Sequence, residues 1–182
     1  MKTLVILGNR NRKGMTSQAA DALIEGFTES GGTAEKVYLP ELAIERCRQC
    51  DEDGWGRCRD KDECAADDDF AGLVEKLRAA DLVVFATPVY YSDLSESMRA
   101  FVDRLRRVSR NDRGGIKGKA AVGICVAGGG GGGAPACAAN LQKILSGCKL
   151  DVLDMVPARR QNIELKLPVL RTTGRWLASQ LG

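Results

Sequence analysis

Short runs of consecutive apolar residues alternate along this chain with longer segments in which apolar residues recur every three or four positions. Runs such as Leu4–Leu7 and Leu82–Ala86 contain no polar alternation, which is typical of strands covered on both faces. The longer segments have the spacing of amphipathic helices. We therefore expect strands at residues 2–8, 36–39, 82–86, 120–126 and 150–156.

Helices are expected in the segments that follow these strands. Thr16 or Ser17 is placed to cap the first helix. Asp93 and Glu96 have the spacing of a capping box at the start of another. The remaining helices are expected to begin at Phe70, to follow Pro135 and to occupy residues near 167–181.

Five strands separated by helices predict an α/β fold with an open parallel sheet, since parallel neighbours need crossover connections. We expect the strand order 2-1-3-4-5, helices on both faces in three layers, and one domain over residues 1–182. Residues 41–69 interrupt the alternation with many charges and four of the seven cysteines. They predict a loop insertion after the second strand.

Composition excludes several classes of function. The 182 residues carry a net charge of +3 and only 5% are aromatic, so we expect no nucleic-acid partner. We see no apolar run that could span a bilayer and no leader before the first strand, so we expect a soluble cytoplasmic protein without a membrane partner. Histidine is absent, so catalysis must depend on other groups or on a cofactor.

Sheets of this kind bind ligands beyond the carboxyl ends of their strands, where loops 9–17, 87–93 and 127–134 are expected to meet. The first loop leads into a helix N-terminus, which stabilises an anion such as phosphate. The alternative is a solvated turn with a helix cap. The loop lacks the Lys-Ser/Thr ending of a triphosphate loop and the three-glycine dinucleotide fingerprint, which disfavours ATP and Rossmann dinucleotides.

The other two loops suit a flat ring. Thr87-Pro88-Val89-Tyr90-Tyr91-Ser92 places backbone amides and aromatic side chains at a strand end, unless the tyrosines only cover the sheet. Six glycines, Gly128–Gly133, let the backbone approach a ligand closely, unless they form a flexible linker. Together the three loops predict a site for a mononucleotide with an aromatic head.

The segments Gly8–Thr16, Thr87–Ser92 and Ala100–Arg104 resemble the NADPH-dependent FMN reductase family, particularly its iron-sulfur flavoprotein branch. The resemblance covers about residues 1–157. It implies a flavodoxin-like fold, FMN as cofactor and a homodimer or homotetramer. It also implies NAD(P)H as electron donor and a small-molecule or protein acceptor.

By this resemblance the first loop would hold the FMN phosphate, and the second and third would contact the isoalloxazine ring. The implied cofactor-binding residues are Asn9, Asn11, Gly14, Thr16, Ser17, Thr87, Pro88, Val89, Tyr90, Tyr91, Gly128, Gly129 and Gly130. Asn9 and Asn11 stand where the family often has serine and arginine. Arg10 or Arg12 would compensate.

Cys47, Cys50, Cys58 and Cys64 form the pattern C-x2-C-x7-C-x5-C within the insertion. Four thiolates suit a 4Fe-4S cluster or a tetrahedral zinc ion. The iron-sulfur flavoproteins that the insertion resembles usually have a further cysteine at the position of Asp53, for which Cys58 would substitute. A cluster is the leading expectation. Zinc, a redox-active disulfide and free thiols are the alternatives.

Charge is uneven between two segments. Residues 51–69 hold nine acidic and three basic side chains, whereas residues 99–119 hold eight basic and two acidic ones. These segments could pair across a subunit interface, or the basic one could dock a dinucleotide phosphate or an acidic partner. The alternative is a set of solvated faces.

We expect an NAD(P)H-dependent FMN reductase in which the flavin receives hydride and passes electrons on, through a cluster where one is present. No side chain is expected to be catalytic. One alternative is an FMN-binding electron carrier without NAD(P)H turnover. Another is a zinc-stabilised binding module without flavin.

Overall fold

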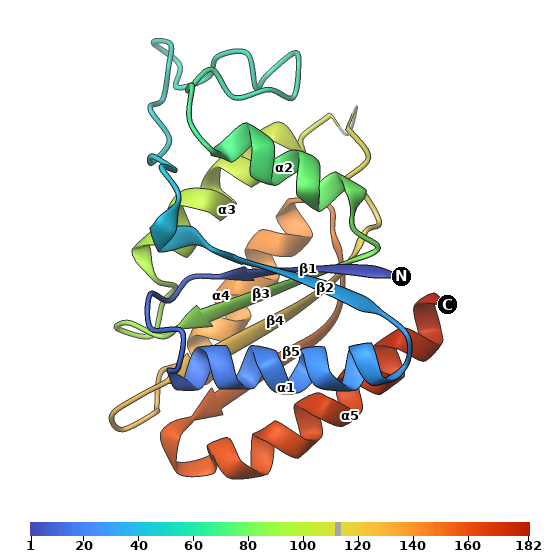
Figure 1. Cartoon of the computed structure of the whole chain (residues 1–182). Helices are drawn as coiled ribbons and strands as arrows, with labels where there is room; N and C mark the ends of the chain where they lie inside the picture. The colour runs from blue at the N-terminus through green and yellow to red at the C-terminus, as the bar shows by residue number, and fades with distance from the viewer. Residues whose placement is uncertain (112–113) are drawn as a thin grey trace.

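The computed structural model describes residues 1–111 and 114–182. Its centre is a five-stranded sheet in which all neighbouring strands run parallel, in the order β2-β1-β3-β4-β5 (Figure 1). The predicted α/β fold and strand order are confirmed. The strands are β1 (Lys2–Leu7), β2 (Thr33–Tyr38), β3 (Leu82–Pro88), β4 (Ala120–Ala127) and β5 (Asp151–Arg159).

Helices cover both faces of the sheet, which gives three layers (Figure 1). One layer contains α1 (Met15–Glu29) and α5 (Ile163–Leu181), and the other contains α2 (Phe70–Ala79), α3 (Glu96–Val108) and α4 (Ala134–Gly147). Short 3-10 turns at Leu39–Glu41 and Arg160–Asn162 follow β2 and β5. Among the described residues, no helix combines the length and apolar character needed to cross a membrane.

The apolar runs lack polar alternation because each strand in the middle of the sheet has two buried faces. In β1, Leu4 and Ile6 pack in the core beneath α2, α3 and α4. Val5 and Leu7 pack in the core beneath α1 and α5. The edge strands β2 and β5 are less buried, so apolar runs alone underestimated their lengths.

Helices α1 and α5 cross in close contact at two glycines. A Cβ atom on Gly26 would overlap the carbonyl oxygen of Arg171, and a Cβ atom on Gly174 would overlap that of Leu23. Only a residue without a side chain lets the two backbones approach this closely. The crossing therefore fixes one layer of the fold.

Two expected helix starts are wrong. Helix α1 begins at Met15 with Gly14 as its N-cap, so Thr16 and Ser17 lie within the first turn. Helix α3 is capped by Ser95, whose Oγ accepts a hydrogen bond from the Met98 amide at 3.4 Å. The predicted capping box of Asp93 and Glu96 does not form the cap. Residues 90–93 form a hairpin instead, which moves the helix start two residues along the chain.

The insertion after β2 forms neither helix nor strand between residues 42 and 69. It lies beside α2 and α3, away from α1 and α5 (Figure 1). Its two ends meet at a neck, where the Ala43 amide donates to Asp69 Oδ2 at 2.7 Å and the Asp69 amide donates to the Ala43 carbonyl at 3.2 Å. The two ends of the insertion are thus held together at this neck.

Candidate functional site

Three loops meet at the carboxyl edge of the sheet, as the strand order requires (Figure 1). The Gly8 amide donates to the Ala86 carbonyl at 2.8 Å, and the Val89 amide donates to the Val126 carbonyl at 3.0 Å. These bonds extend the strand pairing into the loops. Loops 9–14, 89–95 and 128–133 are therefore neighbours across β1, β3 and β4.

The first loop is folded around Asn9, which is 8% exposed. Its Nδ2 donates to the Asn11 carbonyl at 2.8 Å and to Ser17 Oγ at 2.9 Å, while its buried Oδ1 has no partner among the described residues. No described side chain caps α1 at Gly14. The first amides of the helix and one amide oxygen are thus left for a ligand.

Two basic side chains of this loop differ in their surroundings. Arg12 binds Glu41 through Nε and Nη2 and lies 4.5 Å from the centre of the Tyr38 ring. This side-chain pairing with Glu41 raises the pKa of Arg12 above its usual value. Arg12 is therefore engaged with the end of β2, and Arg10 is exposed.

The second loop is anchored by Thr87, which is fully buried. Its Oγ1 accepts a hydrogen bond from the Ser95 amide at 3.1 Å, so the end of β3 and the cap of α3 are held together. Pro88 ends β3, and Val89 continues its pairing with β4.

Residues 90–93 form a tight hairpin above this anchor. Tyr90 and Asp93 exchange two backbone hydrogen bonds of 3.0 and 2.9 Å. Tyr91 and Ser92 have φ angles of 48° and 65°, the left-handed pair that two-residue hairpins require. Both tyrosine side chains point outward, since Tyr90 is 51% exposed and Tyr91 is fully exposed. The two tyrosine side chains therefore do not cover the sheet.

The glycine loop packs against that hairpin. A Cβ atom on Gly133 would meet Ser92 Oγ at 2.7 Å, so the two loops are in close contact. The Gly129 carbonyl accepts a hydrogen bond from Gln161 Nε2 at 2.8 Å, which ties the loop to the end of β5. Gly128 and Gly130 face open space. This loop is held at both sides, which argues against a free linker.

Two polar residues behind the hairpin, Arg99 and Asn140, escaped the sequence analysis, and both bind Asp93. Arg99 Nη2 donates to both Asp93 oxygens at 2.6 and 2.7 Å, and Asn140 Nδ2 donates to Asp93 Oδ1 at 3.3 Å. Burial opposes ionisation of Asp93, but the hydrogen bonds from Arg99 and Leu94 hold its pKa below the usual value. The hairpin is thereby fixed to α3 and α4. No local spacing signals a contact between residues 93 and 140.

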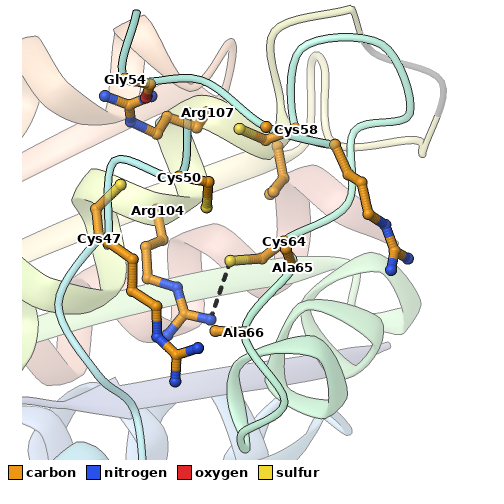
Figure 2. A pocket seen from close by; sticks show the side chains of 13 residues that line it. Cys47, Cys50, Gly54, Cys58, Cys64, Ala65, Ala66, Arg104 and Arg107 are labelled. Carbon is orange, nitrogen blue, oxygen red and sulfur yellow. Dashed lines mark hydrogen bonds between the residues drawn. The ribbon is translucent and has the colours of Figure 1, made fainter. Parts of the chain in front are cut away.

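The four cysteines of the insertion line one pocket together with Arg48, Arg57, Arg104 and Arg107 (Figure 2). The pocket has an empty volume of about 390 Å³, part of it open to solvent. All seven cysteines of the chain are free thiols. Among the described residues, no three His, Cys, Asp or Glu side chains are grouped closely enough to hold a metal ion. The sequence thus identified residues that share a pocket, but this arrangement is not a formed metal site.

The oppositely charged segments meet within one chain. Arg104 pairs with Asp68, and Arg107 lies 4.6 Å from the centre of the Trp55 ring. Asn111 Nδ2 donates to Asp62 Oδ1 at 2.9 Å. Residues 112–113 of the basic segment lie outside the described part. The basic side of α3 therefore supports the acidic insertion.

The other three cysteines of the chain are buried in the core. Cys125 lies in β4, Cys137 in α4, and Cys148 directly follows α4. Burial raises the pKa of Cys148 to about 12. This thiol therefore stays protonated at neutral pH.

Comparison with known proteins identifies related sequences and related structures. An iron-sulfur flavoprotein of Archaeoglobus fulgidus is 34% identical over 71% of this chain, and the match spans 56% of that relative's length. An NAD(P)H:quinone oxidoreductase from Methanothermobacter marburgensis is 25% identical, with a TM-score of 0.69 over 97% of this chain and 96% of that one.

An archaeal flavodoxin shares the fold at 12% identity, with a TM-score of 0.65 over 100% of this chain and 99% of that one. The fold is therefore flavodoxin-like. Residues 1–162 match the family described as NADPH-dependent FMN reductase, and this range includes all three loops and the cysteine insertion. The chain belongs to the NADPH-dependent FMN reductase family.

Proposed function

We propose that this protein is an FMN-dependent oxidoreductase that takes electrons from NAD(P)H and passes them to a small-molecule or protein acceptor. The observation that carries the proposal is the meeting of three loops at one sheet edge in a chain of the FMN reductase family. The site offers uncapped helix amides, a glycine backbone and exposed tyrosines. These suit a phosphate and a flat ring.

In this proposal the start of α1 holds the FMN phosphate. The amides of the first turn face the anion, with Asn9, Asn11, Gly14, Thr16 and Ser17 around it. The unpartnered Oδ1 of Asn9 would accept a hydrogen bond from a hydroxyl of the FMN ribityl chain, since an acceptor does not suit the phosphate itself.

The ring would lie between the hairpin and the glycine loop. Residues proposed to border it are Thr87, Pro88, Val89, Tyr90, Tyr91, Gly128, Gly129 and Gly130. When bound, FMN supplies the hydride and electron chemistry. The chain's own residues bind and orient it through fixed backbone, because Thr87, Ser95 and Gln161 hold the loops in place. We assign no side chain a proton-transfer role.

The test is aerobic and anaerobic purification followed by an absorbance spectrum and steady-state oxidation of NADPH and NADH. We expect stoichiometric FMN, its reduction by at least one of the two dinucleotides, and turnover with a quinone acceptor. Protein that binds FMN but is not reduced by either dinucleotide would instead be an electron carrier. Protein that fails to bind added FMN contradicts the proposal.

A finer proposal is an iron-sulfur cluster on Cys47, Cys50, Cys58 and Cys64. It is supported by relatives named iron-sulfur flavoproteins and by the shared pocket. It is opposed because no three potential ligands among the described residues are grouped closely enough to hold a metal ion. Iron and acid-labile sulfide measured on anaerobically purified protein decide the matter, and iron-free protein would leave a simple FMN reductase.

We also propose that the protein is a homodimer or homotetramer. Leu165, Val169 and Trp176 on α5 are 66%, 46% and 47% exposed and lie along one side of that helix. Large apolar side chains gathered in this way are typical of interaction surfaces. Light scattering should give a multiple of the chain mass. A smaller mass for Trp176→Glu would locate the contact on α5.

A further inference from the structure

Arg104 is the largest fully buried side chain of the described residues and is 1% exposed. It projects from α3 toward the insertion and lines the cysteine pocket (Figure 2). A buried guanidinium is costly unless it is paired and hydrogen-bonded. Its partners therefore indicate what this residue holds in place.

The partners of Arg104 come from both arms of the insertion. Nη1 donates to the Glu45 carbonyl at 2.9 Å on the incoming arm. Both terminal nitrogens bind Asp68 on the outgoing arm, at 2.6 and 2.8 Å, and the guanidinium lies 4.1 Å from the centre of the Phe70 ring. Asp68 Oδ2 in turn accepts from the Glu45 amide at 3.0 Å. Arg104 thus closes the neck of the insertion.

One further bond points into the pocket. Nη2 of Arg104 donates to Cys64 Sγ at 3.2 Å (Figure 2). Figure 2 marks this hydrogen bond with a dashed line. The bond fixes the direction in which the Cys64 sulfur points. Bonds from Arg104 to Glu45 and Asp68 alone would be enough to join the two arms of the insertion. The bond to sulfur gives Arg104 a role toward the thiols.

Helix α3, which carries Arg104, also holds the loop after β3 that is proposed to border the flavin ring. Ser95 caps α3 and is tied to Thr87, and Arg104 lies nine residues further along, about 14 Å at the helical rise. Arg104 is therefore placed to hold the cysteine pocket at a fixed position relative to the carboxyl edge of the sheet.

We infer that Arg104 is the positioning residue of the cysteine pocket: its guanidinium directs the Cys64 sulfur into the pocket while it joins the two arms of the insertion. The inference rests on the cysteine pocket of the proposed function, and it requires neither FMN nor a metal ion.

The experiment measures the rate at which each cysteine is alkylated by iodoacetamide, resolved by peptide mass spectrometry. Four variants are compared with the wild type. Arg104→Lys keeps the charge but loses the fork that reaches Asp68 and Cys64 together. Arg104→Met removes the charge, and Arg104→Met with Asp68→Asn also removes the carboxylate left unpaired. Arg106→Met, on the exposed side of the same helix, is the control.

We expect Cys64 to be alkylated about tenfold faster or more in Arg104→Lys and in the double variant, with the rates compared below the melting temperature of every protein, because both changes also weaken the neck. Cys125 and Cys148 should stay protected, which shows that the core is intact. Arg106→Met should match the wild type. An unchanged Cys64 rate in either folded variant overturns the inference, and so does an equal acceleration at all seven cysteines. The double variant keeps the test decisive where Arg104→Met fails to fold.

FMN, iron and sulfide contents are measured on the same samples. Wild-type protein without FMN contradicts the proposed function, while the alkylation rates still test Arg104. Wild-type FMN content in a variant with accelerated Cys64 alkylation separates the thiol role from flavin binding.

Discussion

At the scale of single residues, small side chains decide how closely the loops of the carboxyl edge can approach. Gly8 lies at the end of β1, where a Cβ atom would overlap Ser95 Oγ and approach Thr87 Oγ1 to 3.3 Å. Both of these oxygens hold the start of α3. Glycine is needed here because of contact, since its φ angle is not in the left-handed region.

We predict that Gly8→Ala lowers the free energy of unfolding by about 1–3 kcal/mol, as overpacking does, and weakens FMN binding. Urea unfolding and fluorescence titration with FMN measure the two effects. The control is Gly72→Ala in α2, where a Cβ atom meets nothing within 4 Å. That change should raise stability by roughly 0.5–1 kcal/mol. Equal effects of both substitutions would contradict the prediction.

Asn9 provides a second test at this scale. Asn9→Ala removes the bonds to the Asn11 carbonyl and Ser17 Oγ, so the first loop loses its internal support. We expect an FMN dissociation constant about tenfold higher, in line with the loss of one or two hydrogen bonds. Gln18→Ala, which removes only an exposed bond to the Lys13 carbonyl, is the matched control.

The sequence predicted where these residues lie better than what they do. Asn9, Thr16 and Ser17 are buried where the first loop meets α1, and their roles toward FMN stay predictions. The hairpin at Tyr91 and Ser92 could not be predicted, because neither residue favours the left-handed conformation that tertiary contacts impose. Arg104 ends one of the segments that resemble the family, but its contacts were not predicted, since its partner Asp68 lies 36 residues away in an irregular loop.

At the scale of elements, the free energy of unfolding depends on the charge of Asp68 at the neck of the insertion. Burial opposes ionisation of Asp68, but hydrogen bonds from Arg104 and from the Glu45 and Phe70 amides hold its pKa below the usual value. A carboxyl whose pKa is lowered by folding stabilises the protein above its unfolded pKa. That contribution is lost as pH falls through the folded pKa.

We therefore predict that the free energy of unfolding declines below about pH 4. Asp68→Asn should show a smaller decline, because its amide does not titrate. Urea unfolding of both proteins across the acid range measures the difference. Parallel pH profiles for the two proteins would show that Asp68 does not contribute.

The α1–α5 crossing offers another test of an element. Gly174→Ala places a methyl group against the Leu23 carbonyl, which belongs to rigid helix backbone. We expect a loss of roughly 2–4 kcal/mol of unfolding free energy, larger than that for an ordinary core methyl. Gly147→Ala at the end of α4, whose Cβ atom would meet only the Arg106 side chain at 3.7 Å, should be nearly neutral.

Strand and helix types followed from the sequence because β1, β3 and β4 are buried on both faces. The start of α3 did not follow from the sequence, because Ser95 rather than Asp93 caps this helix once the hairpin has formed. The strand order followed from chain connectivity, which parallel crossovers restrict to few solutions. The path of the insertion has no such restriction.

At the scale of the whole molecule, FMN should stabilise the folded chain by mass action. At a free FMN concentration 100 times the dissociation constant, the free energy of unfolding should rise by about 2.7 kcal/mol. Thermal unfolding over a range of FMN concentrations measures this. Hydrogen exchange should slow in the loops after β1, β3 and β4 and stay unchanged in residues 47–64. A melting temperature that does not change with FMN concentration would contradict binding at this edge.

Because its two ends are joined at the neck, the insertion could be exchanged for another segment as a unit. The hydrogen-bonded pair Ala43 and Asp69 already closes the chain, so a short turn could join residues 43 and 69. The core would then lose the packing of Ile44, Trp55, Cys58 and Cys64. Other peptide segments could be grafted at the same two points, about 14 Å along α3 from the flavin loops. Arg104 would have to change with each graft, because it contacts both arms and Cys64, and so would Arg107, which donates to the Gly54 carbonyl.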